Sequence, residues 1–252
     1  MSGVLAVGDM HLKQTVILPL VDQALQTVEV DTIVLMGDYL DEWNQNVNVD
    51  RYEDEMSYLV QWVKKKRESM TVICLLGNHD LPYLTQNYRY YSAPLLEIQR
   101  AMTGYLEALE PRLYFQAGEW LFTHAGAVGQ GELPFAIFDD LQFGTAETKK
   151  LLFELEDTID TARGGDAEYG SIVWADYHYS LLTQANPNYP KQIVGHSPVS
   201  NIDEWMDLID VDTFSLTRDG QPIGDGSLLF IDGDTRQVIP TSYQEDILSH
   251  EF

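Results

Sequence analysis

Five short motifs hold most of the residues in this chain that could bind a metal ion or transfer a proton. They are Gly8-Asp9-Met10-His11, Gly37-Asp38-Tyr39-Leu40-Asp41, Gly77-Asn78-His79-Asp80, His124-Ala125-Gly126 and Gly195-His196. Carboxylate and amide oxygens together with imidazole nitrogens suit divalent metals such as manganese, iron or zinc. Each motif by itself is more often an ordinary turn or a structural histidine. The ordered series, with every motif after an expected strand, favours a single metal site.

Apolar runs rich in β-branched residues precede the first three motifs. Residues 4–7, 31–36 and 71–76 are each predicted to form a short buried strand that ends at a glycine. A glycine lets the chain turn sharply, so the polar residue that follows is left at the carboxyl end of the strand. Ligands bind at this edge in open α/β sheets. We therefore expect the first three motifs to meet at one sheet edge.

Apolar residues at helical spacing predict crossover helices over 16–29 and 55–68, with a polar loop over 42–54 before the second helix. The first 80 residues are thus predicted to run β-α-β-α-β, the order typical of a parallel sheet. The elements expected after them are a loop over 81–91, a helix over 94–109, a hairpin of strands 113–116 and 120–123, a helix over 147–157, and strands over 192–194, 209–214, 227–231 and 237–240. This pattern predicts an antiparallel second half.

Length and composition predict one domain over residues 1–252. They also argue against two kinds of partner, nucleic acids and membranes. The chain has 40 acidic and 15 basic residues, a formal charge of −25, so we expect no nucleic-acid partner. The acidic excess indicates either a solubility adaptation or a cationic partner. Cys74 is the one cysteine, which excludes an internal disulfide. No segment approaches the roughly 18 apolar residues of a membrane span, and the N-terminus lacks a signal-peptide pattern. We therefore predict a cytoplasmic protein without a membrane partner.

The motif series resembles the calcineurin-like metallophosphoesterases over residues 8–196. Within that superfamily it is most similar to the phosphoprotein (serine/threonine) phosphatase branch. The segments that carry this second resemblance are Tyr88-Arg89-Tyr90-Tyr91, His124-Ala125-Gly126 and Val173-Trp174-Ala175-Asp176. The resemblance implies an α/β fold in which two facing mixed β-sheets are flanked by helices.

The resemblance also implies a binuclear site for two divalent metal ions, with Mn²⁺ favoured and Fe, Zn or Mg as alternatives. Asp9 and His11 are implied to bind the first ion, and Asp38 is implied to bridge both. The implied remaining ligands of the second ion are Asn78, His124 and His196. A water or hydroxide held between the metals is the implied nucleophile. His79, paired with Asp41, is implied to give a proton to the leaving oxygen rather than to bind metal.

The chain departs from this branch at both of its phosphate-binding arginines. The first is replaced by Glu42, and no arginine follows the Trp-x-Asp segment between Arg163 and Arg218. Arg89 is therefore the candidate substrate-binding residue. Glu42 is expected either to face the substrate phosphate, where it would repel a dianionic monoester, or to turn into solvent with the loop that follows it.

These observations predict a metal-dependent phosphoesterase that acts on phosphomonoesters, with a phosphorylated small molecule or a phosphoprotein as substrate. The alternative within the enzymes is hydrolysis of a phosphodiester or a dinucleoside polyphosphate. The alternative of another class is a catalytically inactive metal-binding interaction module. The oligomeric state has no sequence signal. The presence of all six expected ligands favours an enzyme over the inactive module.

Overall fold

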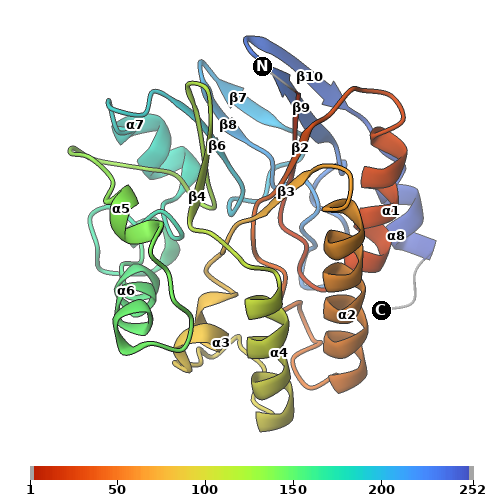
Figure 1. The fold of residues 1–252 in the computed structure, drawn as a ribbon, viewed down its shortest axis with the longest axis vertical. Coiled ribbons are helices and arrows are strands. Elements are labelled where there is room, and N and C mark those ends of the chain that lie inside the picture. Colours follow the sequence, from red (N-terminus) through yellow and green to blue (C-terminus); the bar gives the residue numbers. More distant parts are fainter. Residues whose placement is uncertain (1–2, 250–252) are drawn as a thin grey trace.

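Two five-stranded β-sheets lie at the centre of the fold, with helices on the outside (Figure 1). The structure is a computed structural model that describes residues 3–249. The strand order is β10-β9-β1-β2-β3 in the first sheet and β4-β5-β6-β8-β7 in the second. Each sheet contains both parallel and antiparallel pairs. The predicted α/β fold of two mixed sheets flanked by helices is confirmed.

The first sheet is built on three parallel strands, β1 (Val4–Val7), β2 (Thr32–Leu35) and β3 (Thr71–Cys74). They are the three strands expected from the sequence, and the first three motifs leave from their carboxyl ends. Two strands near the C-terminus, β9 (Leu228–Asp232) and β10 (Thr235–Ile239), extend this sheet in antiparallel fashion on the β1 side. The sequence pattern does not predict that these tail strands pair with β1.

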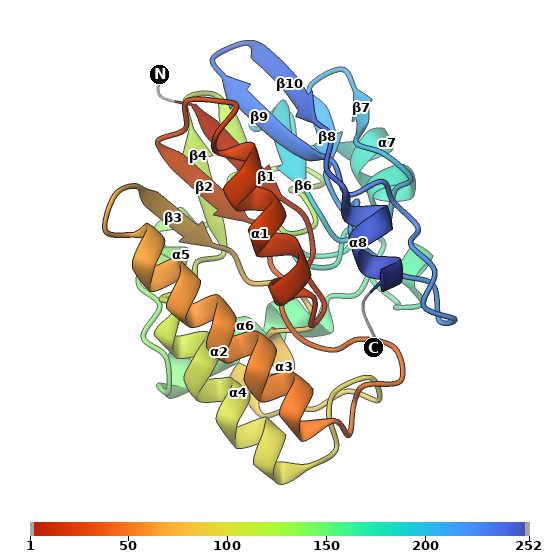
Figure 2. The ribbon, with the colours of Figure 1, turned by 90° about the vertical axis from the view of Figure 1, so that its right-hand side faces the viewer.

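The crossover helices α1 (Gln14–Ala24) and α2 (Val49–Lys66) lie in front of the first sheet in Figure 2. Both expected helices are present, but α2 begins at Val49 rather than at 55, so the loop predicted over 42–54 is wrong for its second half. The earlier start has a local cause, because the side chain of Asn48 accepts a hydrogen bond from the backbone N–H of Arg51 at 3.2 Å.

A short helix, α3 (Leu81–Thr85), occupies the first part of the segment predicted as a loop over 81–91. Pro82 lies in its first turn, where the missing backbone N–H has no helical partner to lose. The next helix, α4 (Leu96–Ala108), agrees with the helix expected over 94–109 and packs against α2 (Figure 2). The correction at α3 matters because this helix carries a tyrosine of the candidate site.

The described strands of the second sheet form two parallel and two antiparallel pairs, so the antiparallel second half predicted from the sequence is wrong for the two parallel pairs. β4 (Tyr114–Ala117) and β5 (Trp120–Thr123) form the expected hairpin, but β6 (Lys191–Val194) and β8 (Leu208–Asp210) continue from β5 in parallel. β7 (Asp203–Trp205) closes the edge in antiparallel fashion. A parallel pair needs a long crossover. The crossover from β5 to β6 contains α5 (Phe135–Phe138), α6 (Ala146–Asp157), η1 (Thr161–Arg163), η2 (Tyr177–Leu181) and α7 (Leu182–Gln184).

The three parallel strands of the first sheet are buried on both faces over most of their length, whereas β10 is largely exposed. In β1, Leu5 and Val7 join the apolar cluster shared with the helices, whereas Ala6 joins Phe122 and Ile193 of the second sheet. Burial on both sides explains why the sequence of this strand is apolar throughout. The last helix, α8 (Tyr243–Ser249), packs beside α1 (Figure 2). Among residues 3–249, we find no helix with the length and apolar character to cross a membrane.

Candidate metal centre

The five motifs converge at one end of the two sheets. They directly follow β1, β2, β3, β5 and β6, which are joined by parallel pairs within each sheet. A direct bond links the first motif to the last, because the backbone N–H of His196 donates to Asp9 Oδ2 at 3.0 Å. Each sheet therefore contributes side chains to the same cluster.

The backbone of this cluster is held in an unusual conformation. Four non-glycine residues have left-handed backbones, with φ values of 41° at His11, 49° at Asp38, 61° at Asp41 and 70° at His196. This conformation is uncommon for residues with a side chain and persists only where the surrounding structure enforces it. Strain of this kind gathers at functional sites.

Two motif glycines allow the chain segments of the site to approach closely. A Cβ atom on Gly77 would lie 2.1 Å from Asp38 Oδ1, and one on Gly195 would lie 2.3 Å from Asp9 Oδ1. Asp80 links the loop of Gly77 to the loop of Asp38, because its Oδ2 accepts hydrogen bonds from the backbone N–H groups of both residues at 2.9 Å. A larger residue at either glycine would push a carboxylate out of place.

Asp38 lies between two groups of possible metal ligands. In one group, His11 Nε2 is 3.6 Å from Asp38 Oδ2. In the other, His124 Nε2 is 3.4 Å from the same oxygen and 3.0 Å from Asn78 Oδ1. One ligand atom from each of Asp38, His124 and His196 lies within 4.8 Å of the others. The structure thus brings all six predicted ligands together, while their binding of metal stays a prediction.

The donor atoms of the cluster suit divalent cations. Asp9 Oδ1 and His196 Nε2 are buried without a hydrogen-bond partner among the described residues. Burial, followed by the charges of Asp212 and Asp38, raises the pKa of Asp9 well above its ordinary value. Burial and then the charge of Arg163 lower the pKa of His196, which favours the neutral imidazole that binds metals. Buried, unpaired oxygen and nitrogen donors are costly unless a cation compensates them.

Backbone carbonyls orient two of the imidazole rings. His11 Nδ1 lies 3.1 Å from the carbonyl of Leu40 and 2.7 Å from that of Asp41. His124 Nδ1 lies 2.9 Å from the carbonyl of Met36. A carbonyl only accepts hydrogen bonds, so each Nδ1 carries the proton. Nε2 of each ring then faces Asp38, and in His124 it also faces Asn78 Oδ1 at 3.0 Å. A metal ion bound there would take the place of a proton on Nε2.

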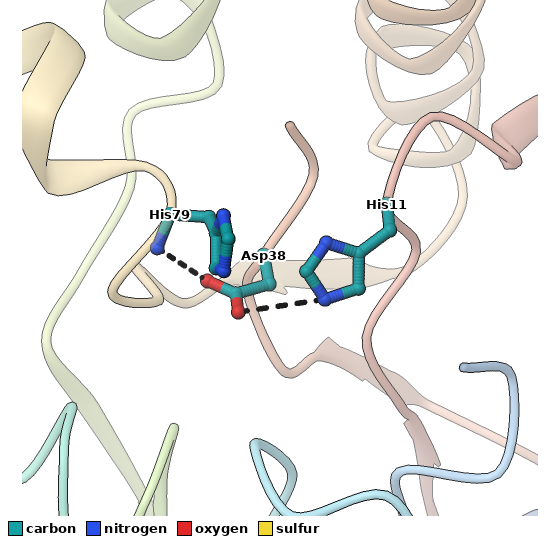
Figure 3. A group of neighbouring side chains, drawn as sticks. All are labelled: His11, Asp38 and His79. Atoms are coloured by element: carbon teal, nitrogen blue, oxygen red, sulfur yellow. Dashed lines mark hydrogen bonds and ion pairs between the residues drawn. The ribbon is translucent and has the colours of Figure 1, made fainter. Parts of the chain in front are cut away.

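His79 and His11 both lie beside Asp38, and their rings are in edge-to-face contact with centroids 4.9 Å apart (Figure 3). The backbone N–H of His79 donates to Asp38 Oδ1 at 2.8 Å, and its Nδ1 is 3.2 Å from Asp41 Oδ2. Burial alone would lower the pKa of His79, but Asp38 and Asp41 outweigh it and raise the pKa to about 9. Its ligand atom also lies within 4.8 Å of those of His11 and Asp38. The geometry therefore suits a proton donor and also permits a metal ligand.

Two buried tyrosines hold Asp41, and the sequence analysis missed both. The hydroxyl of Tyr52, on α2, donates to Asp41 Oδ1 at 2.6 Å, and that of Tyr83, on α3, donates to the same oxygen at 2.5 Å. The backbone N–H of Ala93 in turn donates to the Tyr83 hydroxyl at 2.8 Å. No spacing relates these tyrosines to Asp41, because α2 and α3 reach it only through packing.

The charges next to the motifs are arranged differently from the sequence expectations. Glu42 neither turns into solvent nor stays unpaired, because Lys13 Nζ is 2.5 Å from its Oε2 and both side chains are buried. Arg89, the predicted substrate-binding residue, pairs with Glu156 at 2.5 Å and with Asp157 at 3.2 Å. Its role stays a prediction, although these carboxylates already occupy its guanidinium.

Comparisons with known proteins agree with this geometry. A family model described as calcineurin-like phosphoesterase matches residues 3–223. A protein serine/threonine phosphatase from Saccharomyces cerevisiae with similarity to human phosphatase PP5 superposes with a TM-score of 0.59 at 12% identity, covering 95% of this chain and 80% of that one. A putative diadenosine tetraphosphatase gives 0.50 at 17% identity, covering 95% and 94%. A hypothetical protein from Pyrococcus horikoshii OT3 gives 0.52 at 10% identity, covering 98% and 91%. At these identities the structures share the fold. No curated protein matched the sequence.

Proposed function

This chain belongs to the calcineurin-like phosphoesterases, and from that membership we propose that it hydrolyses phosphomonoesters with two divalent metal ions. As a member of the family it is a metal-dependent phosphoesterase. The observation that carries the two-metal proposal is the position of Asp38, which is shared by two separate groups of ligand atoms. A carboxylate between two such groups can bridge two cations.

The ligands divide around Asp38. The structure groups His11 and His79 with Asp38 on one side, and His124 and His196 with it on the other. By the family resemblance, Asp9 and His11 would hold the first ion with Asp38, and Asn78, His124 and His196 would hold the second with it. When bound, such a metal pair supplies an activated water and charge stabilisation of the phosphoryl oxygens. The backbone carbonyls behind His11 and His124 orient these rings before any metal arrives.

His79 supplies the proton for the leaving oxygen. Asp41 holds its Nδ1, so Nε2 is the atom that can deliver a proton to a substrate above the cluster. The two tyrosine hydroxyls on Asp41 restrict the carboxylate to one position, which in turn restricts the ring. This His79–Asp41 pair is a reason to prefer an enzyme to an inactive metal-binding module.

A second candidate function, hydrolysis of a dinucleoside polyphosphate or another nucleotide ester, is favoured by the aromatic residues beside His79. The ring of Tyr91 lies 4.3 Å from that of His79, and the neighbouring Tyr90 is 95% exposed. Exposed aromatic rings next to a leaving-group site could stack on a nucleobase. The absence of nucleic-acid and membrane partners and the cytoplasmic location stay predictions from composition.

The first test is metal content and activity in matched histidine variants. We expect two Mn²⁺ ions per wild-type chain by elemental analysis, and loss of one ion together with activity in His124→Ala. The control is His178→Ala, because His178 is 53% exposed, pairs with Asp203 and belongs to none of the five motifs. A wild-type protein that binds no Mn²⁺, Fe²⁺, Zn²⁺ or Mg²⁺ would contradict the proposal.

The second test is a substrate panel. Turnover of a phosphoserine peptide, an alkyl monoester, bis(p-nitrophenyl) phosphate and diadenosine tetraphosphate should be compared at equal metal loading. Preference for the monoesters supports the leading proposal, and preference for the dinucleotide supports the second candidate.

A further inference from the structure

Arg163 lies directly beside the second group of metal ligands. Its Nη2 donates to the hydroxyl of Ser197 at 2.5 Å and is 3.5 Å from the carbonyl oxygen of His196. Its Nε is 2.7 Å from Asp176 Oδ2. Because Ser197 directly follows the expected ligand His196, the guanidinium lies close to the second group of ligands.

The loop that carries Arg163 is held in one shape. Asp160 Oδ1 accepts the backbone N–H of Ala162 at 2.8 Å, and Asp160 Oδ2 accepts that of Asp176 at 3.2 Å. The buried carboxylate of Asp160 therefore links the turn that carries Arg163 to Asp176, whose side chain pairs with the Arg163 guanidinium. Gly164, with a φ of 85°, ends the turn. An arginine held in this way loses little further freedom when it binds an anion.

Other cations near the motifs are already committed to protein groups. Lys13 is fully buried against Glu42, and Arg89 forms ion pairs with two carboxylates. Arg51 donates from two nitrogens to the carbonyl of Leu12. Arg163 pairs with one carboxylate, whereas Arg89 pairs with two, and its side chain is 24% exposed, whereas that of Lys13 is fully buried. Within residues 3–249 the hydrogen bonds and ion pair of Arg163 involve Nε and Nη2, which leaves Nη1 for an anion. It keeps donors that an external anion can use.

We propose that Arg163 binds the phosphoryl oxygens of the substrate and makes the site selective for dianionic monoesters. The inference rests on the proposed phosphoesterase function. A planar guanidinium can bind two oxygens of one phosphate, and its attraction is greater for a dianion than for a monoanionic diester. Arg163 precedes the Trp174-Ala175-Asp176 segment, whereas the resemblance calls for an arginine after it. In this chain the positive charge beside the ligands therefore comes from a residue before this segment rather than after it.

The test compares Arg163 with Arg236, whose side chain has a similar exposed fraction of 23% and is also paired with carboxylates, those of Glu204 and Asp207. The variants are Arg163→Lys, Arg163→Met and Arg236→Lys, each loaded with Mn²⁺ and checked for metal content. A hydrogen bond to a charged group contributes about 1.5–3 kcal/mol, so Arg163→Met should raise the Kd for inorganic phosphate by about 10- to 100-fold. By calorimetry, the Kd of Arg163→Lys should lie between the values of this variant and wild type, and the Kd of Arg236→Lys should stay within about twofold of wild type.

The kinetic arm uses a matched monoester and diester. In Arg163→Met the KM for the monoester should rise by about the same factor as the phosphate Kd, with a smaller change for the diester. Equal changes for both substrates, or unchanged phosphate binding in both Arg163 variants, would overturn the inference while leaving the phosphoesterase proposal intact. A wild-type protein without metal or hydrolysis would instead defeat the proposed function itself.

A third measurement does not depend on any variant folding. Phenylglyoxal modifies exposed arginines, and the sites in wild-type, metal-loaded protein can be mapped by mass spectrometry with and without phosphate. Protection of Arg163 by phosphate supports the inference, and protection of Arg89 without Arg163 overturns it.

Discussion

Replacement of His79 by alanine should lower turnover of an alkyl phosphomonoester by about 10²–10⁴-fold without changing the metal content. At 1.36 kcal/mol per tenfold, this range is about 2.7–5.4 kcal/mol of transition-state stabilisation. The structure supports a large effect for two reasons. Asp41 holds the Nδ1 of His79 at 3.2 Å, which fixes the orientation of the ring. The raised pKa of His79, about 9, keeps its proton available at neutral pH.

The assay must separate proton donation from metal binding, because the His79 ring also lies near the ligand atoms of His11 and Asp38 (Figure 3). Turnover is therefore measured with an alkyl ester and with p-nitrophenyl phosphate, whose leaving group needs little protonation. A lost general acid predicts a much smaller defect for the nitrophenyl ester. Elemental analysis of the same samples gives metal per chain, and His178→Ala serves as the surface control.

Two results would refute this reasoning. Loss of one metal ion per chain in His79→Ala would mean that His79 is a ligand. An equal drop in turnover for both esters, at full metal content, would mean that His79 does not protonate the leaving group.

Three further predictions concern groups around the site. Tyr83→Phe removes one of the two hydrogen bonds that hydroxyl groups donate to Asp41. A hydrogen bond to a charged group contributes about 1.5–3 kcal/mol, so kcat for the alkyl ester should fall by about tenfold or more while KM stays unchanged. A change in KM alone would argue that Tyr83 does not position the His79–Asp41 pair. Glu42→Leu leaves the buried Lys13 ammonium without its carboxylate, with only the carbonyl of His11 still bound to it, and should lower the free energy of unfolding by about 3–5 kcal/mol in urea denaturation. Lys13→Met/Glu42→Leu should recover most of this loss, and an equally unstable double variant would contradict the prediction. Metal-free protein should lose thermal stability as the pH rises from about 6.5 to 9, because a group with a raised pKa binds its proton more tightly when folded, and that stabilisation is lost as the folded-state pKa is passed. The groups are His79 and Asp80, whose pKa values are raised to about 9 and about 7. The lowered pKa values of His11 and His196 oppose this trend only below about pH 6.5. A melting temperature in EDTA that rises over this range would show that the sign is wrong.

The sequence by itself determined the three parallel strands of the first sheet and the residues that follow them at one edge. Short apolar runs over 4–7, 31–36 and 71–76 form strands because their β-branched residues and closing glycines are local signals. Helices between these strands oblige them to run parallel, so Asp9, Asp38 and Asn78 had to meet at one edge. The resemblance added His124 and His196 from the second sheet, and the structure brings them to the same place.

Only the tertiary structure decided how charges and hydrogen bonds are shared around that edge. Glu42 meets Lys13 across 29 residues of chain, Arg89 meets Glu156 across 67, and Arg163 meets Ser197 across 34. The tyrosines on Asp41 and the parallel course of β5, β6 and β8 depend in the same way on how distant elements pack. Turn residues and hydrophobic periodicity report on the nearest few positions along the chain. The partner of a buried charge is instead chosen by whichever element packs against it, because burial without a partner costs more than most single contacts provide.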